Sequence, residues 1–184
     1  MFDYMLRGWP SVLGGSIFRR FFFRKRFNSI GVGVTIGDDV VIEGFRSISI
    51  GANTSFMSGS YIYAHGGGRL EVGEDCSFNH NVLLDASGGH IQIGSSVLVG
   101  PNVVFRASDH DFSQPDKPIR LQGHRAGTII VEDNVWFAAN VVVTTNVRIG
   151  TGCVIGAGSV VTRDLPPMTL CVGAPAVPIR SRLA

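Results

Sequence analysis

The sequence predicts an all-β solenoid, in which short strands coil around a common core, and three observations support this fold class. Apolar side chains recur every six residues across 131–161, and an even period keeps them on one face of an extended chain, whereas a helix would scatter them. Gly150, Gly156, Asn140 and Asn146 punctuate this stretch, and both residue types tolerate the positive φ values of tight corners. Similar hexads recur from residue 30 onward, so that stacked coils can share one core.

Composition is consistent with a single folded domain. Apolar residues make up 45% of the 184 residues and charged residues 16%, which excludes disorder, and the 24 glycines lack the three-residue period of collagen. The cysteines, Cys76, Cys153 and Cys171, are odd in number and lack the close spacing of a zinc site, so we interpret them as buried thiols in a reducing compartment. Neither a secretory signal nor a run of about 20 apolar residues is evident. We therefore predict a cytoplasmic protein.

Residues 1–29 form a basic and aromatic N-terminal segment. Residues 1–26 hold six basic side chains against one acidic one, which leaves 10 basic (16 − 6) and 13 acidic (14 − 1) residues in the rest of the chain. The run SIFRRFFFRKRF, residues 16–27, predicts a short helix whose aromatic side chains cap the solenoid or pack on a neighbouring subunit, because solenoids need capped ends. A peripheral contact of residues 1–27 with the inner face of a membrane is the alternative. No motif indicates nucleic acid as a partner.

The solenoid itself is predicted over residues 30–165, followed by a C-terminal tail at 166–184. Sets of three hexads start at residues 36, 50, 72, 93, 131 and 149, and the extra residues fall between the sets. The longest interruption, at 106–128, has no repeat of its own, and such long loops are usually functional. It begins with Ser108-Asp109-His110-Asp111, in which flanking carboxylates could fix the histidine tautomer, and His124 lies near its end. A loop histidine is by default solvated and without a role.

The run IGTGCVIGAGSVVTRDLPPMTLCVGAPAVPIR, preceded by DNVWFAANVVV, resembles the C-terminal half of the hexapeptide-repeat acyltransferases. The similarity is to the branch of galactoside, maltose and polysaccharide O-acetyltransferases, and it covers about residues 30 to 182. This resemblance implies a left-handed parallel β-helix with a protruding loop. It also implies a homotrimer with active sites between subunits, acetyl-CoA as acyl donor and a saccharide as acceptor.

The resemblance also implies roles for individual residues. His110 matches the catalytic histidine, whereas His124 has no counterpart and keeps the interpretation without a role. Asn79 matches an asparagine that contacts the acceptor, although a corner asparagine without chemistry is equally consistent. Asp85 is expected to contact the acceptor, and Trp136 to form a wall of the site. The expected coenzyme A contacts are Ala139, Ala157, Thr162, Arg163 and Arg180, and arginine at 163, where relatives often have lysine, can still bind phosphate.

The predicted reaction moves an acetyl group directly from acetyl-CoA to a hydroxyl of a surface-polysaccharide or lipopolysaccharide precursor, with His110 as general base and no metal. An N-acyltransferase acting on an amino sugar is the first alternative. A metal enzyme like the γ-class carbonic anhydrases is disfavoured, because Pro115 stands five residues after His110 where a third histidine would be needed. A non-catalytic trimeric scaffold is the third alternative.

Overall fold

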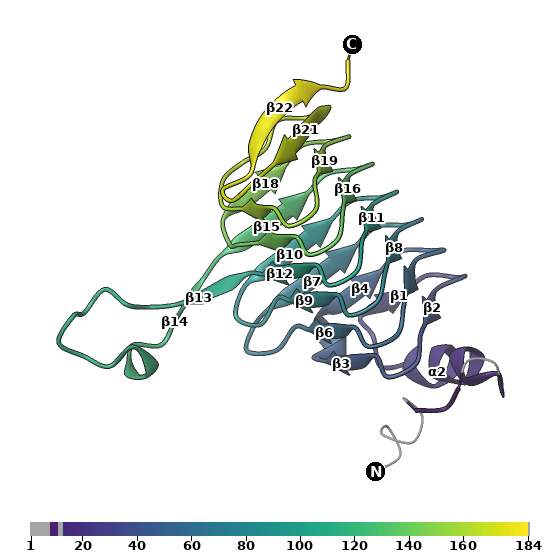
Figure 1. Ribbon diagram of the computed structural model, residues 1–184. Coiled ribbons are helices and arrows are strands. Elements are labelled where there is room, and N and C mark those ends of the chain that lie inside the picture. The colour runs from purple at the N-terminus through teal and green to yellow at the C-terminus, as the bar shows by residue number, and fades with distance from the viewer. Residues whose placement is uncertain (1–7, 11–12, 184) are drawn as a thin grey trace.

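The computed structural model describes residues 8–10 and 13–183, and these form a parallel β-solenoid with a short N-terminal helix (Figure 1). Each coil contributes one strand to each of three sheets, and the strands within a sheet are parallel up to β21. The first sheet contains β1 (Ser29–Ile30), β4 (Ile48–Ile50), β7 (Arg69–Val72), β10 (His90–Ile93), β15 (Thr128–Val131) and β18 (Val147–Ile149). The predicted β-solenoid with a short N-terminal helix and a protruding loop is thus confirmed.

The second and third sheets complete the six coils. The second sheet contains β2 (Thr35–Ile36), β5 (Ser55–Phe56), β8 (Ser77–Phe78), β11 (Leu98–Val99), β16 (Trp136–Phe137), β19 (Val154–Ile155), β21 (Thr169–Val172) and β22 (Val177–Ser181). The third contains β3 (Val41–Glu43), β6 (Tyr61–Tyr63), β9 (Leu83–Asp85), β12 (Val104–Arg106), β17 (Val142–Val143) and β20 (Val160–Val161). β21 therefore extends the second sheet into residues 166–184, and β22 pairs with it in antiparallel orientation.

Two of the corners between the sheets carry predicted site residues. The middle corner joins the second sheet to the third and comprises residues 37–40, 57–60, 79–82, 100–103, 138–141 and 156–159. The closing corner joins the third sheet to the first sheet of the following coil and comprises residues 44–47, 64–68, 86–89, 107–127 and 144–146. All the large insertions between the hexad sets lie at the closing corner. A site built from insertions is therefore confined to that corner.

The core consists of the hexad side chains, stacked coil upon coil. The six predicted inward residues of 131–161 are at most 1% exposed: Val131, Phe137, Val143, Ile149, Ile155 and Val161. Aromatic rings from different coils touch inside, because Phe56 stacks on Phe78 at 4.6 Å and Phe105 meets Phe137 edge-on at 5.0 Å. In-register pairing of equivalent residues in successive coils makes this continuous core possible.

The first hexad set was predicted to start at residue 36, and this phase is wrong. Ile30 pairs with Ile50, so that the first coil runs through Ile30, Ile36 and Ile42. Ile48 belongs to the second coil, because a 3₁₀ turn, η2 (Phe45–Ser47), separates it from Ile42. The six-residue spacing from 42 to 48 therefore spans a corner turn and two different sheets.

The corner residues divide into two kinds. Asn140 and Asn146 have φ values of 59°, as predicted. Gly150 and Gly156 were also expected to have positive φ values, and this is wrong. In those two hexads the glycines with positive φ are Gly152 and Gly158. A side chain at Gly150 would instead meet the backbone of the tail, with a Cβ only 2.5 Å from the Pro167 nitrogen. Close approach between coils, and not left-handed backbone, explains this glycine.

The helix α2 (Gly15–Phe23) lies at the N-terminal end of the solenoid (Figure 1). Arg19, a residue of this helix, is fully buried. Its guanidinium donates hydrogen bonds to the Ile36 carbonyl at 3.0 Å and to the Asp38 carboxylate at 2.6 Å. Phe23 and Phe27 are buried as well, so one side of this segment covers the first coil. The opposite side exposes apolar side chains, among them Phe21 at 80%. Of the basic segment, residues 1–7 and 11–12 lie outside the described residues.

Candidate active site

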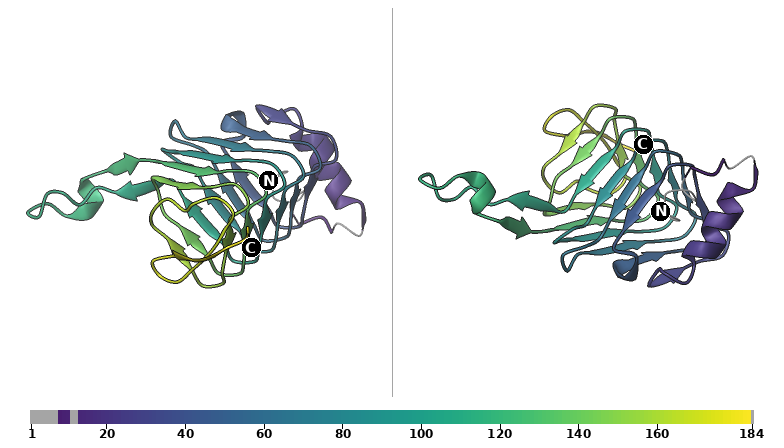
Figure 2. Two further views of the ribbon diagram at one scale, coloured as in Figure 1. Left: turned by 90° about the horizontal axis from the view of Figure 1, so that it is seen from above. Right: turned by 90° about the horizontal axis from the view of Figure 1, so that it is seen from below.

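The insertion at 106–128 is an antiparallel hairpin that projects from the closing corner (Figures 1 and 2). β13 (Ser108–His110) pairs with β14 (His124–Ala126), and a 3₁₀ turn, η3 (Ile119–Leu121), lies between them. The register places His110 directly opposite His124, and their exposed rings have centroids 4.2 Å apart. His124 was predicted to have no role. The symmetric placement of the two histidines about the middle of the insertion is the signal that could have revealed the pair.

Polar contacts hold the hairpin in shape. The Asp111 carboxylate accepts hydrogen bonds from the Ser113 backbone N–H at 2.9 Å and from Arg125 at 2.7 Å. These bonds lower the pKa of Asp111 to about 2, the Ser113 N–H contributing most. Asp111 was expected to be able to orient His110, but its carboxylate is engaged within the hairpin turn instead. The carboxylate of Asp111 therefore orders the hairpin next to His110.

A pocket of about 610 Å³ lies at the base of the hairpin, and its walls include Tyr63, His65, Asp85, Arg106 and His124. Asp85, the predicted acceptor contact, is 6% exposed. One of its carboxylate oxygens accepts from the Ser87 N–H at 2.9 Å, and the other pairs with Arg106. Asp85 therefore orders the corner and orients the guanidinium of Arg106, and both residues line the pocket.

One polar atom of this pocket is unusual. The Ser87 hydroxyl is the only buried side-chain oxygen or nitrogen within residues 8–10 and 13–183 that has no hydrogen-bond partner. Because Ser87 also lines the pocket, a bound ligand could supply the missing bond. Neither Ser87 nor Arg106 is among the predicted site residues. Arg106 follows Phe105 as Asp85 follows Leu84, so the repeat could have revealed their in-register pairing, whereas the burial of Ser87 at a corner is not visible in a hexad pattern.

Asn79, Ala139 and Ala157 lie at the middle corner, away from the hairpin. The two alanines are stacked in successive coils, and the Ala139 carbonyl accepts from the Gly158 N–H at 3.0 Å. The side chain of Asn79 accepts from its neighbour, the His80 N–H, at 2.7 Å. Asn79 and His110 are therefore on different corners of the solenoid.

Trp136 and Arg180 come together on the outer face of the second sheet. They line a groove of about 450 Å³ with Val154, Leu170 and Arg182, and Trp136 is 50% exposed. Pairing of β16, β19, β21 and β22 places Trp136, Val154, Leu170 and Arg180 on successive strands. Thr162 and Arg163, the other predicted coenzyme contacts, are exposed after β20, where the third sheet ends. The structure thus brings Trp136 together with Arg180 on the second sheet and Ala139 together with Ala157 at the middle corner, while Thr162 and Arg163 lie after β20.

The cysteines are buried inside the solenoid. Cys153 and Cys171 occupy neighbouring coils with their sulfurs 3.8 Å apart. Burial raises the pKa of Cys153 to about 12, with Cys171 adding to the effect, and burial also raises the pKa values of Cys171 and Cys76. Neutral, buried thiols are poor nucleophiles. Within the part of the chain that the structure describes, no group of three His, Cys, Asp or Glu side chains is arranged to hold a metal.

The chain is similar in sequence to hexapeptide-repeat proteins, among them known and putative acetyltransferases. Residues 128–163 match the family model described as bacterial transferase hexapeptide (six repeats), and residues 27–44 match the hexapeptide repeat of succinyl-transferase. A putative acetyltransferase of Schizosaccharomyces pombe is 43% identical over 117 residues, 63% of this chain and 52% of that protein. The galactoside O-acetyltransferase of Lactococcus lactis is 36% identical over 127 residues, 68% of this chain and 59% of its own length. The chain thus spans little more than half the length of these relatives.

A solved structure is similar over more of the chain. The hexapeptide-repeat acetyltransferase from Vibrio cholerae, in complex with acetyl-CoA, superposes with a TM-score of 0.67. The two are 29% identical, and the match covers 91% of this chain and 78% of the other.

Proposed function

Because the chain belongs to the hexapeptide-repeat acetyltransferase family, we propose that it transfers an acetyl group from acetyl-CoA to a hydroxyl of a saccharide. The observation that carries this proposal is the similarity, over 91% of the chain, to an acetyltransferase solved with acetyl-CoA. The hairpin beside a polar pocket supports it, since such a pocket can orient the hydroxyls of a sugar.

In the proposed mechanism His110 is the general base. It takes the proton of the acceptor hydroxyl as the oxygen attacks the thioester carbonyl, a role typically worth about 10²- to 10⁴-fold in rate. The tetrahedral intermediate then collapses, the C–S bond breaks, and the coenzyme A thiolate leaves and recovers the proton from His110. The exposed position of His110 on β13 supports its role as the base, because an incoming acceptor can reach the imidazole ring. The buried, neutral cysteines support direct transfer without an acyl-enzyme.

We propose that the enzyme is a homotrimer with its active sites between subunits. The distribution of the candidate residues over separate corners supports this, since a second copy could place its middle corner, with Asn79, against the hairpin. Sedimentation should give three times the chain mass of 19.7 kDa. Mixed oligomers of Asn79→Ala and His110→Ala chains should regain activity that neither variant has alone. Full activity of an isolated monomer would contradict the proposal.

For the donor, we propose that Trp136 forms a wall of the site and that Ala139 and Ala157 bind the pantetheine arm through their backbones. Arg180, Thr162 and Arg163 would contact the adenosine phosphates. The groove shared by Trp136 and Arg180 supports part of this assignment. No metal is invoked in the proposed reaction, and that remains a prediction.

The acceptor is proposed to be a surface-polysaccharide or lipopolysaccharide precursor, modified in the cytoplasm. Incubation of the protein with labelled acetyl-CoA and a panel of saccharides tests the activity and identifies the acceptor. Mild alkali should release the label, because an O-acetyl ester is labile. A label that resists alkali would identify an amide and the alternative activity on an amino sugar. No transfer to any saccharide, from protein that binds acetyl-CoA, would contradict the proposal.

We also propose a peripheral membrane contact through α2. Among the described residues, no helix has the length and hydropathy needed to cross a bilayer. The exposed side chains Ile17, Phe18 and Phe21, beside Arg24 and Lys25, support attachment to an anionic surface. Phe21→Ser and Phe18→Ser should reduce co-sedimentation with phosphatidylglycerol vesicles. They are better tests than deletion of residues 1–27, which would also remove the buried Arg19 and Phe23 and uncover the core.

A further inference from the structure

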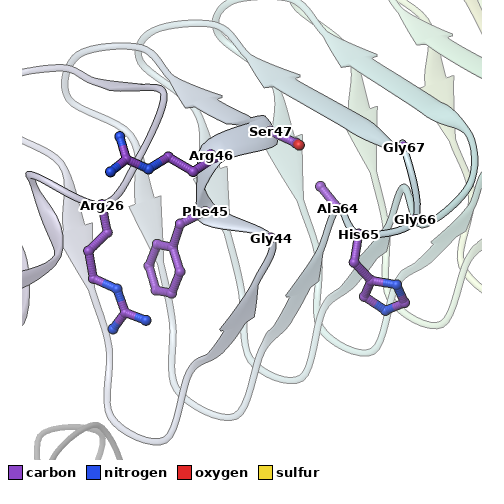
Figure 3. Close-up of a pocket in the computed structure, with 9 residues that line it drawn as sticks. All are labelled: Arg26, Gly44, Phe45, Arg46, Ser47, Ala64, His65, Gly66 and Gly67. Carbon is purple, nitrogen blue, oxygen red and sulfur yellow. The ribbon is translucent and has the colours of Figure 1, made fainter.

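A second pocket lies at the closing corner, next to the pocket at the base of the hairpin (Figure 3). It has a volume of about 450 Å³, and its lining includes Arg26, Phe45, Arg46 and His65. His65 and Gly66 line both pockets, so the two lie next to each other between the end of α2 and the base of the hairpin, and we refer to them together as the groove. The predicted mechanism uses only the hairpin end of this groove.

The net positive charge of the groove lies at its end near α2. Its lining contains Arg26 and Arg46 at one end and Arg106 at the other, with His65 between them and His124 beside the hairpin. Asp85 is the only carboxylate among the lining residues of the two pockets, and it is already paired with Arg106. Beyond the N-terminal segment the chain is acidic overall, with 10 basic and 13 acidic residues. A cationic groove in an acidic body favours an anionic ligand.

The positions of the side chains suit a phosphate group. The Arg26 guanidinium lies over the Phe45 ring, 4.3 Å from its centroid, which limits its freedom before any ligand binds. Figure 3 shows Arg26 and Phe45 on one side of the pocket and His65 on the other, with Gly44 and Ala64 between them. Gly67 has no atom within 4 Å of where a Cβ would stand, so the wall there stays open to a bulky anion. Arg46 is exposed and can turn toward the ligand.

We propose that this groove binds a phosphate or diphosphate group attached to the acceptor saccharide. The inference rests on the proposed function. The phosphate would lie among Arg26, Arg46 and His65, and the sugar would extend past Arg106 toward His110 and His124. Charge-assisted hydrogen bonds to phosphate are stronger than neutral ones, so that a neutral glycoside would bind weakly in comparison.

Two sources can supply such an acceptor, a soluble nucleotide sugar or a lipid diphosphate sugar. The apolar side chains of α2 lie close to the groove, because Phe23 packs against Phe45 with ring centroids 5.3 Å apart. A lipid tail leaving the groove on this side would meet the exposed Phe21 and Phe22. Parallel assays with a nucleotide sugar in solution and with a polyprenyl diphosphate sugar in vesicles distinguish the two sources.

The first test measures binding without turnover. Inorganic pyrophosphate is titrated calorimetrically into the full-length protein and into Arg46→Gln and Arg26→Gln variants. Loss of one charge-assisted contact should weaken binding about tenfold. Arg69→Gln is the matched control, because Arg69 is exposed on β7 and pairs with Glu71 outside the groove. Thermal melts show whether each variant is folded. If Arg26→Gln unfolds, Arg46→Gln still tests the inference, because it alters an exposed side chain.

The second test measures acetyl transfer to matched acceptors. The same sugar is supplied as its methyl glycoside, its 1-phosphate and its nucleotide diphosphate. The phosphorylated forms should have the lower KM, and Arg46→Gln should raise that KM about tenfold while leaving the KM of the methyl glycoside unchanged. The inference would be overturned by equal KM values for neutral and phosphorylated sugars. It would also be overturned if neither arginine substitution changed the affinity for pyrophosphate. Pyrophosphate binding that depends on Arg46, in a protein that transfers no acetyl group, would preserve the anion site and refute the proposed function instead.

Discussion

The imidazole rings of His110 and His124 face each other across the hairpin, with their centroids 4.2 Å apart. His124 also lines the pocket at the hairpin base, so the pair links the proposed base to the proposed acceptor pocket. The antiparallel register fixes this relationship, because it places the two residues directly opposite each other. Substitutions of the two rings should therefore have different kinetic consequences.

His110→Ala should lower kcat by about 10²- to 10⁴-fold, because it removes the group that accepts the hydroxyl proton. Its ring is exposed, so the melting temperature should change little. Steady-state acetyl transfer at saturating acceptor measures the effect. His90→Ala is the control, since His90 lies on the first sheet beside Glu71. Near-normal turnover by His110→Ala would rule out the proposed base.

His124→Phe keeps a ring against His110 and removes the polar atoms that face the pocket. We expect the KM for the acceptor to rise about tenfold, as for loss of a ligand hydrogen bond, with a much smaller change in kcat. Initial rates at varied acceptor and fixed acetyl-CoA separate the two parameters. A loss of kcat equal to that of His110→Ala would instead assign the proton transfer to the pair as a unit.

The sequence predicts the repeat far better than the site. A strict six-residue spacing is enough to place Phe137 and Ile155 inside, because each hexad obeys the same geometry. The pairing of His110 with His124 depends on how the insertion closes on itself, and the Asp85–Arg106 ion pair joins two different coils. The ion pair follows from the repeat, because Asp85 and Arg106 hold equivalent positions in successive coils, but the path of the insertion leaves no periodic pattern in the sequence. The sequence therefore locates the insertion but not the pocket beneath it.

Arg180→Gln should weaken the binding of coenzyme A but not that of dephospho-coenzyme A. The proposed contact is with an adenosine phosphate, and one charge-assisted contact is worth about tenfold in affinity. Trp136 lines the same groove and is half exposed, so quenching of its fluorescence reports binding. Equal weakening for both ligands would place Arg180 away from the 3′-phosphate.

Asn102 should be important for stability at the middle corner. It has a φ of 58°, accepts a hydrogen bond from Asn81 at 3.2 Å and donates one to Asn140 at 3.1 Å. Asn102→Ala loses both bonds and retains a left-handed backbone that costs roughly 1–2 kcal/mol for alanine. Asn102→Gly loses the same bonds without that strain. Thermal melts should therefore rank the wild type first, then Asn102→Gly, then Asn102→Ala, and equal stability of the two variants would contradict the backbone argument.

The three cysteines should resist alkylation in the folded protein. The thiolate is the reactive form, and burial together with Cys171 raises the pKa of Cys153 to about 12, so that its thiol stays protonated until the pH approaches that value. Iodoacetamide at pH 8 should label none of the three in the native state and all of them in urea, as mass spectrometry can show. Native labelling of Cys153 that abolishes acetyl transfer would contradict direct transfer, because it would reveal an accessible nucleophile.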